Sequence, residues 1–291
     1  MRRAIVLGSI VAAWAVSVAA AGLGSAQAPN VAAIAKVKDN LYVVTGGGGN
    51  TAAFVTRDGV VLVDTKLANW GQAILDQVRT VTDKPVTHII NTHTHGDHVG
   101  SNAFFPATVD IVAQANTAAN MRRMDAFRDP AAAHGLPDRT FDDRMTLLDG
   151  PDAIDLYYFG RAHTGGDAFV VFRALRAMHS GDAFAGPQAP IIDVNNGGSG
   201  VAYAETLAKA AAGITGVDTI IPGHSGVTGW QALLDYRDFM TALVASARAS
   251  HAAGRTPAEA VAALDLPARF SEYAMQRAQA DIEVIYRELQ R

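Results

Sequence analysis

Three histidines and one aspartate lie within six residues of this chain, in the sequence Thr-His-Thr-His-Gly-Asp-His. They are His93, His95, Asp97 and His98. Imidazoles this close repel one another when they are protonated, and each needs a polar partner when it is buried in the neutral form. A divalent cation removes both problems, because neutral imidazole and carboxylate are ligands that zinc and iron prefer. The segment is therefore predicted to bind metal.

The spacing of these residues favours two neighbouring metal positions. The β-prone run Val86–Asn91 precedes them, so the segment begins where a strand leaves its sheet. Residues two apart in an extended chain share a face, and so His93 and His95 converge on one ion. The glycine that follows allows the backbone to turn, which directs Asp97 and His98 to an adjacent position.

Three further candidate ligands follow short apolar runs, each close to a glycine: His163, Asp182 and His224. Loops at strand ends are where a scaffold presents functional side chains. With the first four they give seven ligands. Seven exceeds the needs of one tetrahedral zinc ion and suits two metals bridged by a carboxylate.

The HxHxDH pattern, with the later Gly-Arg-Ala-His-Thr, Gly-Asp and Pro-Gly-His sequences, resembles the metallo-β-lactamase superfamily of binuclear hydrolases. The resemblance runs from about Leu41 to the helix after His224. It implies a first metal site, formed by His93, His95 and His163. It implies a second site, formed by Asp97, His98 and His224, with Asp182 bridging the two metals.

The resemblance also implies hydrolysis of a small molecule. Metal lowers the pKa of bound water to about 7, so a hydroxide bridging two metals would attack an ester, thioester, lactone or amide, β-lactams included. Asp97 is expected both to bind metal and to orient this hydroxide. Zinc is the expected metal, with iron and manganese as alternatives, because the same ligands bind all three.

The sequence departs from one group of β-lactamases, which have a cysteine where Asp182 stands and a nearby lysine for the drug's carboxylate. This chain has no cysteine, and the next lysine is Lys209. Aspartate at this position is similar to the glyoxalase II, lactonase and other non-lactamase branches.

Two other activities are disfavoured by the ligand set. The main alternative is an oxidoreductase, since persulfide dioxygenases of the superfamily use a single iron at the first site, but the second site is complete here. Flavin-linked di-iron oxidases have glutamate at the position of His95, which excludes them. A binding protein with a structural metal does not need so complete a set.

The composition is that of a folded domain without affinity for nucleic acid. The chain has 291 residues, of which 49% are hydrophobic, and this is enough for a substantial core. The formal net charge is −4 at pH 7, whereas phosphate binding needs clustered lysine and arginine. The expected partner is a small-molecule substrate.

Residues 1–28 are predicted to be a signal peptide. Arg2 and Arg3 precede a long uncharged stretch that ends in an Ala-Gln-Ala cleavage motif at Ala28. The many alanines and glycines make this stretch weakly hydrophobic for a membrane anchor, and the lack of cysteine fits folding in an oxidising compartment. The expected location is the periplasm or the medium, with no stable membrane insertion, and residues 29–291 are expected to form the hydrolase domain.

The rest of the sequence predicts an α/β fold. Short apolar runs between turn residues predict strands near residues 41–45, 52–56, 60–64, 86–91, 109–112, 145–148, 153–159, 168–172, 177–179 and 219–221. Apolar residues at helical spacing predict helices near residues 67–81, 113–124, 203–212 and 271–289, the last within a helical C-terminal part over about 230–291. Residues 128–143, rich in Pro, Gly and Asp, are expected to form an exposed loop over the site. The resemblance implies a four-layer αβ/βα sandwich with two sheets face to face.

Overall fold

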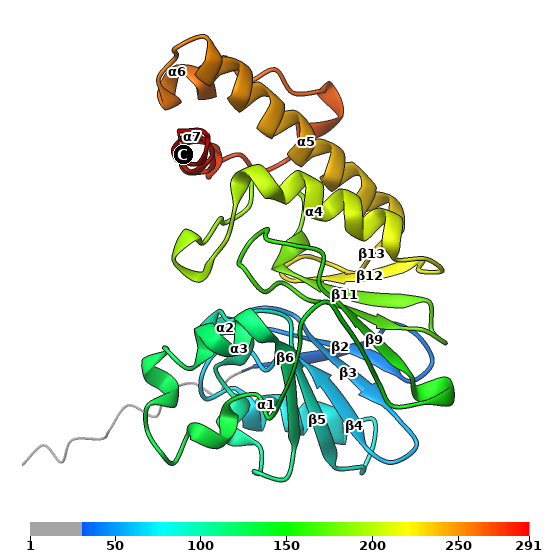
Figure 1. Cartoon of the computed structure of the whole chain (residues 1–291). Coiled ribbons are helices and arrows are strands. Elements are labelled where there is room, and N and C mark those ends of the chain that lie inside the picture. The colour runs from blue at the N-terminus through cyan, green and yellow to red at the C-terminus, as the bar shows by residue number, and fades with distance from the viewer. Residues whose placement is uncertain (1–30, 291) are drawn as a thin grey trace, which may run out of the picture.

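The structure is a computed structural model that describes residues 31–290. The predicted signal peptide over residues 1–28 lies outside them. Two β-sheets lie face to face in the middle of the molecule, and helices cover the outer faces (Figure 1).

Seven strands form the first sheet, in the order of the sequence. They are β1 (Ala33–Lys36), β2 (Leu41–Thr45), β3 (Thr51–Val55), β4 (Val60–Val63), β5 (Val86–Asn91), β6 (Asp110–Gln114) and β7 (Arg139–Phe141). The strands from β1 to β4 pair antiparallel, and those from β4 to β7 pair parallel. The carboxyl ends of β4, β5 and β6 therefore lie at one edge of the sheet.

Six strands form the second sheet, in the order β13-β12-β11-β10-β9-β8. They are β8 (Arg144–Leu147), β9 (Ile154–Tyr157), β10 (Phe169–Phe172), β11 (Ala177–Gly181), β12 (Thr219–Pro222) and β13 (Thr228–Gly229). The helices of the described chain are α1 (Gly71–Arg79), α2 (Gly96–Val99), α3 (Ala115–Met121), α4 (Gly200–Gly213), α5 (Trp230–Ala252), α6 (Pro257–Ala262) and α7 (Ala278–Leu289).

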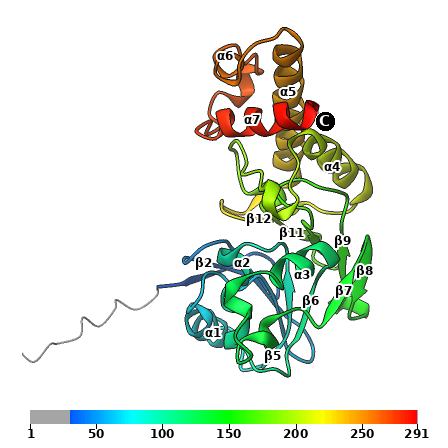
Figure 2. The ribbon, with the colours of Figure 1, turned by 60° about the vertical axis from the view of Figure 1, so that its left-hand side comes forward.

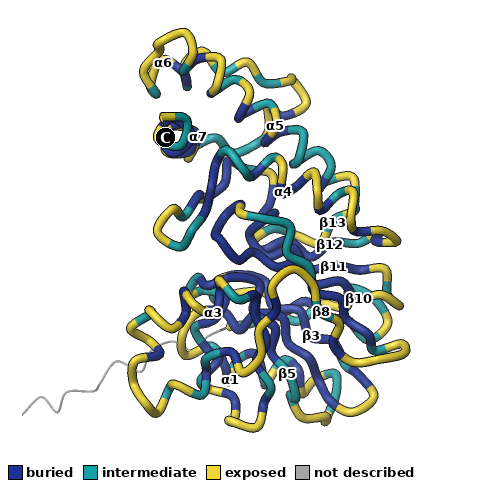
Figure 3. The backbone as a smooth tube through the Cα atoms, in the orientation of Figure 1, coloured by how far each residue is buried: buried dark blue, intermediate teal, exposed yellow. Residues whose placement is uncertain are grey.

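Apolar side chains hold the layers together. Between the sheets, the ring of Phe54 packs edge-on against Phe172 with centroids 5.1 Å apart. On the outer face of the first sheet, Ile74 of α1 is fully buried. On the outer face of the second sheet, Tyr203 of α4 and Tyr236 of α5 are fully buried. The buried stretches concentrate in both sheets (Figure 3), and the predicted αβ/βα arrangement is confirmed.

The C-terminal helices form an extension on the side of the second sheet that faces away from the first (Figure 2). Helix α7 packs against α5 and α6 through a cluster that includes Val244, Ala260 and Ile285. Helix α6 begins with a capping box of Thr256 and Glu259. Among residues 31–290, the helices lack the combination of length and hydropathy that crossing a bilayer requires.

Three local predictions are wrong. Helix α1 begins at Gly71 rather than at Leu67, because Asn69 has a φ of 67°, which a right-handed helix does not accommodate. Helix α7 begins seven residues late, since the chain before it forms turns and an isolated bridge from Ala274 to Gln188, in a loop of the second sheet. Residues 128–143 do not cover the site: His134 lies 3.0 Å from the carbonyl of Ala103, and part of the segment forms β7.

A buried lysine fixes the glycine-rich turn after β2. Lys66 is fully buried and has a φ of 64°. Its Nζ donates hydrogen bonds to the carbonyls of Val44, at 2.8 Å, and Gly49, at 2.7 Å. Burial lowers the pKa of Lys66 to about 8, and the charge of Asp64 opposes this shift.

Because of Lys66, we expect the free energy of unfolding of the metal-free protein to rise from about pH 8 to pH 10.5. In this range Lys66 is protonated in the unfolded chain but has lost its proton in the folded protein. The folded state therefore no longer carries the cost of a buried charge, and the free energy of unfolding rises with pH. The gain is on the order of 3 kcal/mol. Denaturant titrations across this range should show the increase in the free energy of unfolding in the wild type and not in Lys66→Met. If the free energies of the two proteins changed with pH in the same way, the prediction would be contradicted.

Candidate metal centre

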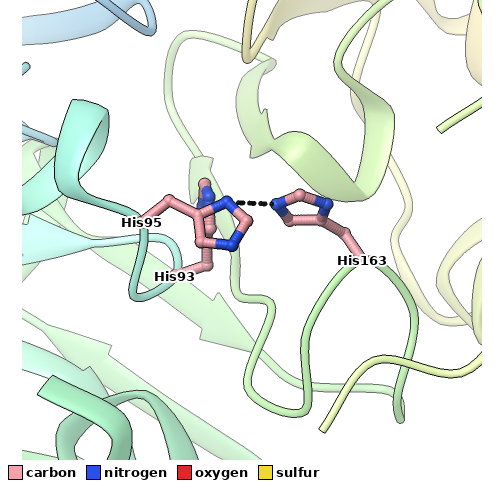
Figure 4. A group of neighbouring side chains, drawn as sticks. All are labelled: His93, His95 and His163. Atoms are coloured by element: carbon pink, nitrogen blue, oxygen red, sulfur yellow. Dashed lines mark hydrogen bonds between the residues drawn. The ribbon is translucent and has the colours of Figure 1, made fainter. Parts of the chain in front are cut away.

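The seven candidate ligands come together where strands of both sheets end. His93, His95, Asp97 and His98 lie in the loop and short helix after β5. His163 precedes β10, Asp182 follows β11 and His224 follows β12. Figure 4 shows the side chains of His93, His95 and His163 pointing toward one another.

Hydrogen bonds around Asp64 determine where two of the imidazoles carry their protons. The hydroxyl of Thr92 donates to Asp64 Oδ2 at 2.7 Å, so it accepts from His93 Nδ1 at 3.0 Å. His98 Nδ1 donates to the same carboxylate at 2.7 Å. A neutral ring has one proton, so Nε2 of His93 carries a free electron pair. Burial would lower the pKa of His98, but the charges of Asp182 and Asp64 raise it, so Nε2 of His98 would be free for a metal only when its second proton leaves.

The same reasoning applies to His95 and His163. His163 Nδ1 donates to the carbonyl of Ile191 at 2.7 Å, and His95 Nε2 donates to Asp193 Oδ2 at 2.8 Å. The two remaining nitrogens, His163 Nε2 and His95 Nδ1, lie 2.9 Å apart (Figure 4). This is a hydrogen-bond distance, so a cation lies between the two nitrogens: a proton when the site holds no metal, or a metal ion that replaces it. The chemistry of the donor set therefore fits a metal ion.

The first candidate group consists of His93, His95 and His163, whose ligand atoms lie within 4.8 Å of one another. His93 Nε2 is buried and has no hydrogen-bond partner among residues 31–290. Burial, reinforced by the neighbouring imidazoles, holds the pKa of His93 well below its usual value. A neutral imidazole with a free electron pair is a metal ligand.

The second candidate group consists of Asp97, His98 and His224, again within 4.8 Å. His224 Nε2 lies 3.3 Å from Asp97 Oδ2 and 3.3 Å from His98 Nε2. Hydrogen bonds to Asp182 and Asp97 raise the pKa of His224 to about 10. In the absence of metal, the carboxylates thus draw a proton onto His224, as expected of ligands that surround a cation.

Asp182 lies between the two groups. One carboxylate oxygen is 3.4 Å from His98 Nε2, and the other is 3.7 Å from His163 Nε2 and 3.2 Å from His224 Nε2. Burial alone would raise the pKa of Asp182, but the charge of His98 and the hydrogen bond from His224 hold it well below the usual value. Its Oδ1 has no donor among the described residues. This position fits a bridge, and the ligand roles of all seven residues stay predictions.

The sequence identified the candidate ligands but not all the residues that position them. Asp64, directly after β4, accepts a hydrogen bond from His98 Nδ1 at 2.7 Å. The sequence did not identify Asp193 as a partner of His95. Asp193 follows an apolar run, as the candidate ligands do, and it also accepts a hydrogen bond from the backbone of Asn195.

Two more polar residues hold the loops of the second sheet. The amide of Asn50 donates to the carbonyls of Pro222 and Ser225, both at 2.8 Å, and so positions the loop that carries His224. His179 bonds to the carbonyl of Asn50 at 3.1 Å and is not part of either group. A Cβ atom at position 223 would overlap the carboxylate of Asp182, so the site requires glycine at this position.

The candidate centre opens into a cleft of about 400 Å³. Its walls consist of His95, Asp97, His163, Asp182, Ala185, Gln188, Ile191, His224 and Arg277. Asp97 is 30% exposed, whereas Asp182 is only 6% exposed. The cleft therefore gives a small molecule access to Asp97 and His224 and leaves Asp182 at its floor.

A model of the metallo-β-lactamase superfamily matches residues 44–238. The chain belongs to this superfamily. The type 2 metallo-β-lactamase of Elizabethkingia meningoseptica is 28% identical over 151 residues, which are 48% of this chain and 57% of that protein. The chain thus matches little more than half of this relative's length. Membership supports a metal-dependent enzyme of the hydrolase type.

Solved structures of the superfamily share the fold at low identity. A metallo-β-lactamase from Pontibacter korlensis superposes with a TM-score of 0.63 at 18% identity, over 72% of this chain and 99% of the other. A stereoselective inverting sec-alkylsulfatase from a Pseudomonas species superposes with a TM-score of 0.72 at 15% identity, over 88% of this chain and 50% of the other. Both likenesses concern the fold.

The positioning carboxylates give a test of the two groups. Asp193→Asn removes the charge beside His95, and Asp64→Asn removes the charge beside His98. Asp193→Asn should weaken the affinity of the first metal about 10- to 100-fold, because outer carboxylates fix the ring and raise its basicity. Asp64→Asn should weaken that of the second metal by a similar factor and, through Thr92 and His93, also that of the first. Competition titrations with a chromophoric chelator measure both affinities. Asp152→Asn is the control, because Asp152 accepts a hydrogen bond only from the backbone of Arg57. If Asp193→Asn and Asp64→Asn bound both metals as tightly as the wild type does, the assignment would be contradicted.

Proposed function

We propose that this protein is a binuclear, zinc-dependent hydrolase of a small ester, thioester, lactone or amide, with β-lactams among the candidate substrates. The observation that carries the proposal is the convergence of unprotonated imidazole nitrogens in the first group, most directly the buried His93 Nε2 without a partner among residues 31–290 and the 2.9 Å between His95 Nδ1 and His163 Nε2. Superfamily membership supports the same reaction class.

His93, His95 and His163 would hold one metal, and Asp97, His98 and His224 the other, with Asp182 between them. When bound, the metals would lower the pKa of water and polarise the scissile bond. Asp97 is the carboxylate that the cleft exposes. Burial would raise the pKa of Asp97, but the hydrogen bond from His224 and the charge of His98 lower it, so Asp97 is an ionised acceptor that orients the attacking water.

The cleft limits the substrate to a small molecule. Its volume of about 400 Å³ lies at the lower end of the range for small-molecule sites. The exposed side chain of Ile191 gives one wall an apolar surface. The persulfide dioxygenase alternative needs only the first group and assigns no role to the second.

Metal content and chelator-sensitive turnover test the proposal. We expect two zinc ions per chain and hydrolysis of nitrocefin or 4-nitrophenyl acetate that a chelator abolishes and added zinc restores. Elemental analysis and absorbance assays provide both values. Two metals without nitrocefin turnover would exclude β-lactams and direct the search to lactones and thioesters. One iron with oxygen uptake on a persulfide would overturn the proposal in favour of the oxidoreductase.

We also propose that the chain acts after export, because residues 1–28 have the sequence of a signal peptide. In a Gram-negative host, the periplasmic fraction should contain a chain that begins after Ala28, or after Ala26 if the proline at position 29 blocks the first cleavage. Intact-mass spectrometry distinguishes these products. A full-length chain in the membrane fraction would show an uncleaved anchor instead.

A further inference from the structure

An arginine of the C-terminal extension lines the cleft of the candidate metal centre. Arg277 is the residue that precedes α7, and it borders the cleft together with Gln188 and Ile191. Its side chain is exposed, and within residues 31–290 its guanidinium forms no hydrogen bond or ion pair. Apart from the histidines, it is the cationic residue of the cleft wall.

Backbone hydrogen bonds fix the position of this arginine. The segment before α7 pairs with the loop after Asp182: Ala189 N donates to the carbonyl of Ala274 at 2.8 Å, and Ala274 N donates to the carbonyl of Pro187 at 3.2 Å. At the far end of α7, Glu288 accepts from the backbone of Val201 at 2.8 Å. The extension is therefore attached on both sides of α7, and Arg277 is held at the cleft rather than on a free tail.

Arg277 forms no ion pair with the acids of residues 31–290. Asp281, one helical turn away, is only 2% exposed, and burial raises its pKa to about 8 although the charge of Arg277 lowers it. Asp281 is therefore mostly protonated at pH 7. Arg269, by contrast, forms an ion pair with Asp238 at 2.8 Å.

We propose that Arg277 binds a carboxylate of the substrate while the scissile bond lies at the metal centre. The guanidinium has a planar fork of donors that matches a carboxylate and stays charged at every physiological pH. Residue 277 lies outside residues 44–238, the part that the superfamily model describes. The inference rests on the proposed function, because it takes the metal centre as the place where the substrate reacts.

An arginine on an exposed helix end is by itself an ordinary solvated residue. Two observations distinguish Arg277 from that case: it shares a cleft with candidate ligands of both metals, and Ala274, three residues earlier, is hydrogen-bonded through its backbone to the loop that follows Asp182. Gln188 of the same loop adds an amide to this wall. A substrate that reaches both Arg277 and the metal centre is oriented at two points, which a lone metal contact does not provide.

Hydroxamates of matched length test this proposal through binding rather than turnover. The hydroxamate group binds zinc, and the other end of the probe is varied. The monohydroxamates of malonic, succinic and glutaric acid carry a carboxylate there, and the alkanoic hydroxamates of the same length carry a methyl group. In the zinc-loaded wild type, calorimetry should show that one carboxylate probe binds about tenfold more tightly than its neutral counterpart.

In Arg277→Gln, this preference should fall to about one, with the affinity for the neutral probes unchanged. Arg248→Ala, which removes an exposed arginine of α5 away from the cleft, is the matched control and should keep the preference. Equal binding of charged and neutral probes at every length, or a preference that survives in Arg277→Gln, would overturn the role of Arg277. Failure of all probes, neutral ones included, would instead overturn the metal centre itself.

Discussion

The buried carboxylate of Asp64 is the interaction on which the candidate centre depends. A carboxylate without water costs several kcal/mol unless donors surround it, and Asp64 is fully buried. It receives hydrogen bonds from the backbone and hydroxyl of Thr92, at 2.8 and 2.7 Å, and from His98 at 2.7 Å. Because β4 and β5 are parallel neighbours, Asp64 and Thr92 leave the sheet at the same edge. The donors that surround this buried charge thus fix the conformation of the loop after β5. They also fix the ring nitrogen of His98 that faces Asp64 and, through Thr92, the ring nitrogen of His93 that carries the proton.

The second sheet completes the site because the core between the sheets sets their separation. Phe54 and Phe172 pack across that core, so the strand ends of the two sheets meet at a fixed distance. His163, Asp182 and His224 then reach ligands that the first sheet supplies. The hydrogen bonds of Asn50 to the loop of His224 link the sheets directly at this edge. A loss of core packing would therefore separate the two halves of the ligand set before it altered either half.

The sequence predicted what depends on local pattern and missed what depends on distant partners. Strands β2 and β5 begin and end where the apolar runs indicated, and the candidate ligands were found because they follow such runs. Asp193 was missed because its partner, His95, is 98 residues away. The late start of α7 has the same origin: the preceding segment pairs with a loop some 85 residues earlier, which helical spacing does not encode. Lys66 was missed since a lysine is seldom fully buried.

Different interactions hold the C-terminal extension and the loops that carry the candidate ligands. The residues that would bind metal are therefore structurally independent of Arg277, which would select the substrate. The ligand loops depend on side-chain partners such as Asp64 and Asn50, so few substitutions there leave the geometry intact. The segment before α7 is attached through main-chain bonds at Ala189 and Ala274, which any side chain at position 277 would preserve. Helix α7 keeps its place through apolar packing and Glu288. Residue 277 is therefore free to change the charge of the cleft wall without disturbing the ligands, and selectivity for the substrate's charge is able to vary independently of the metal chemistry.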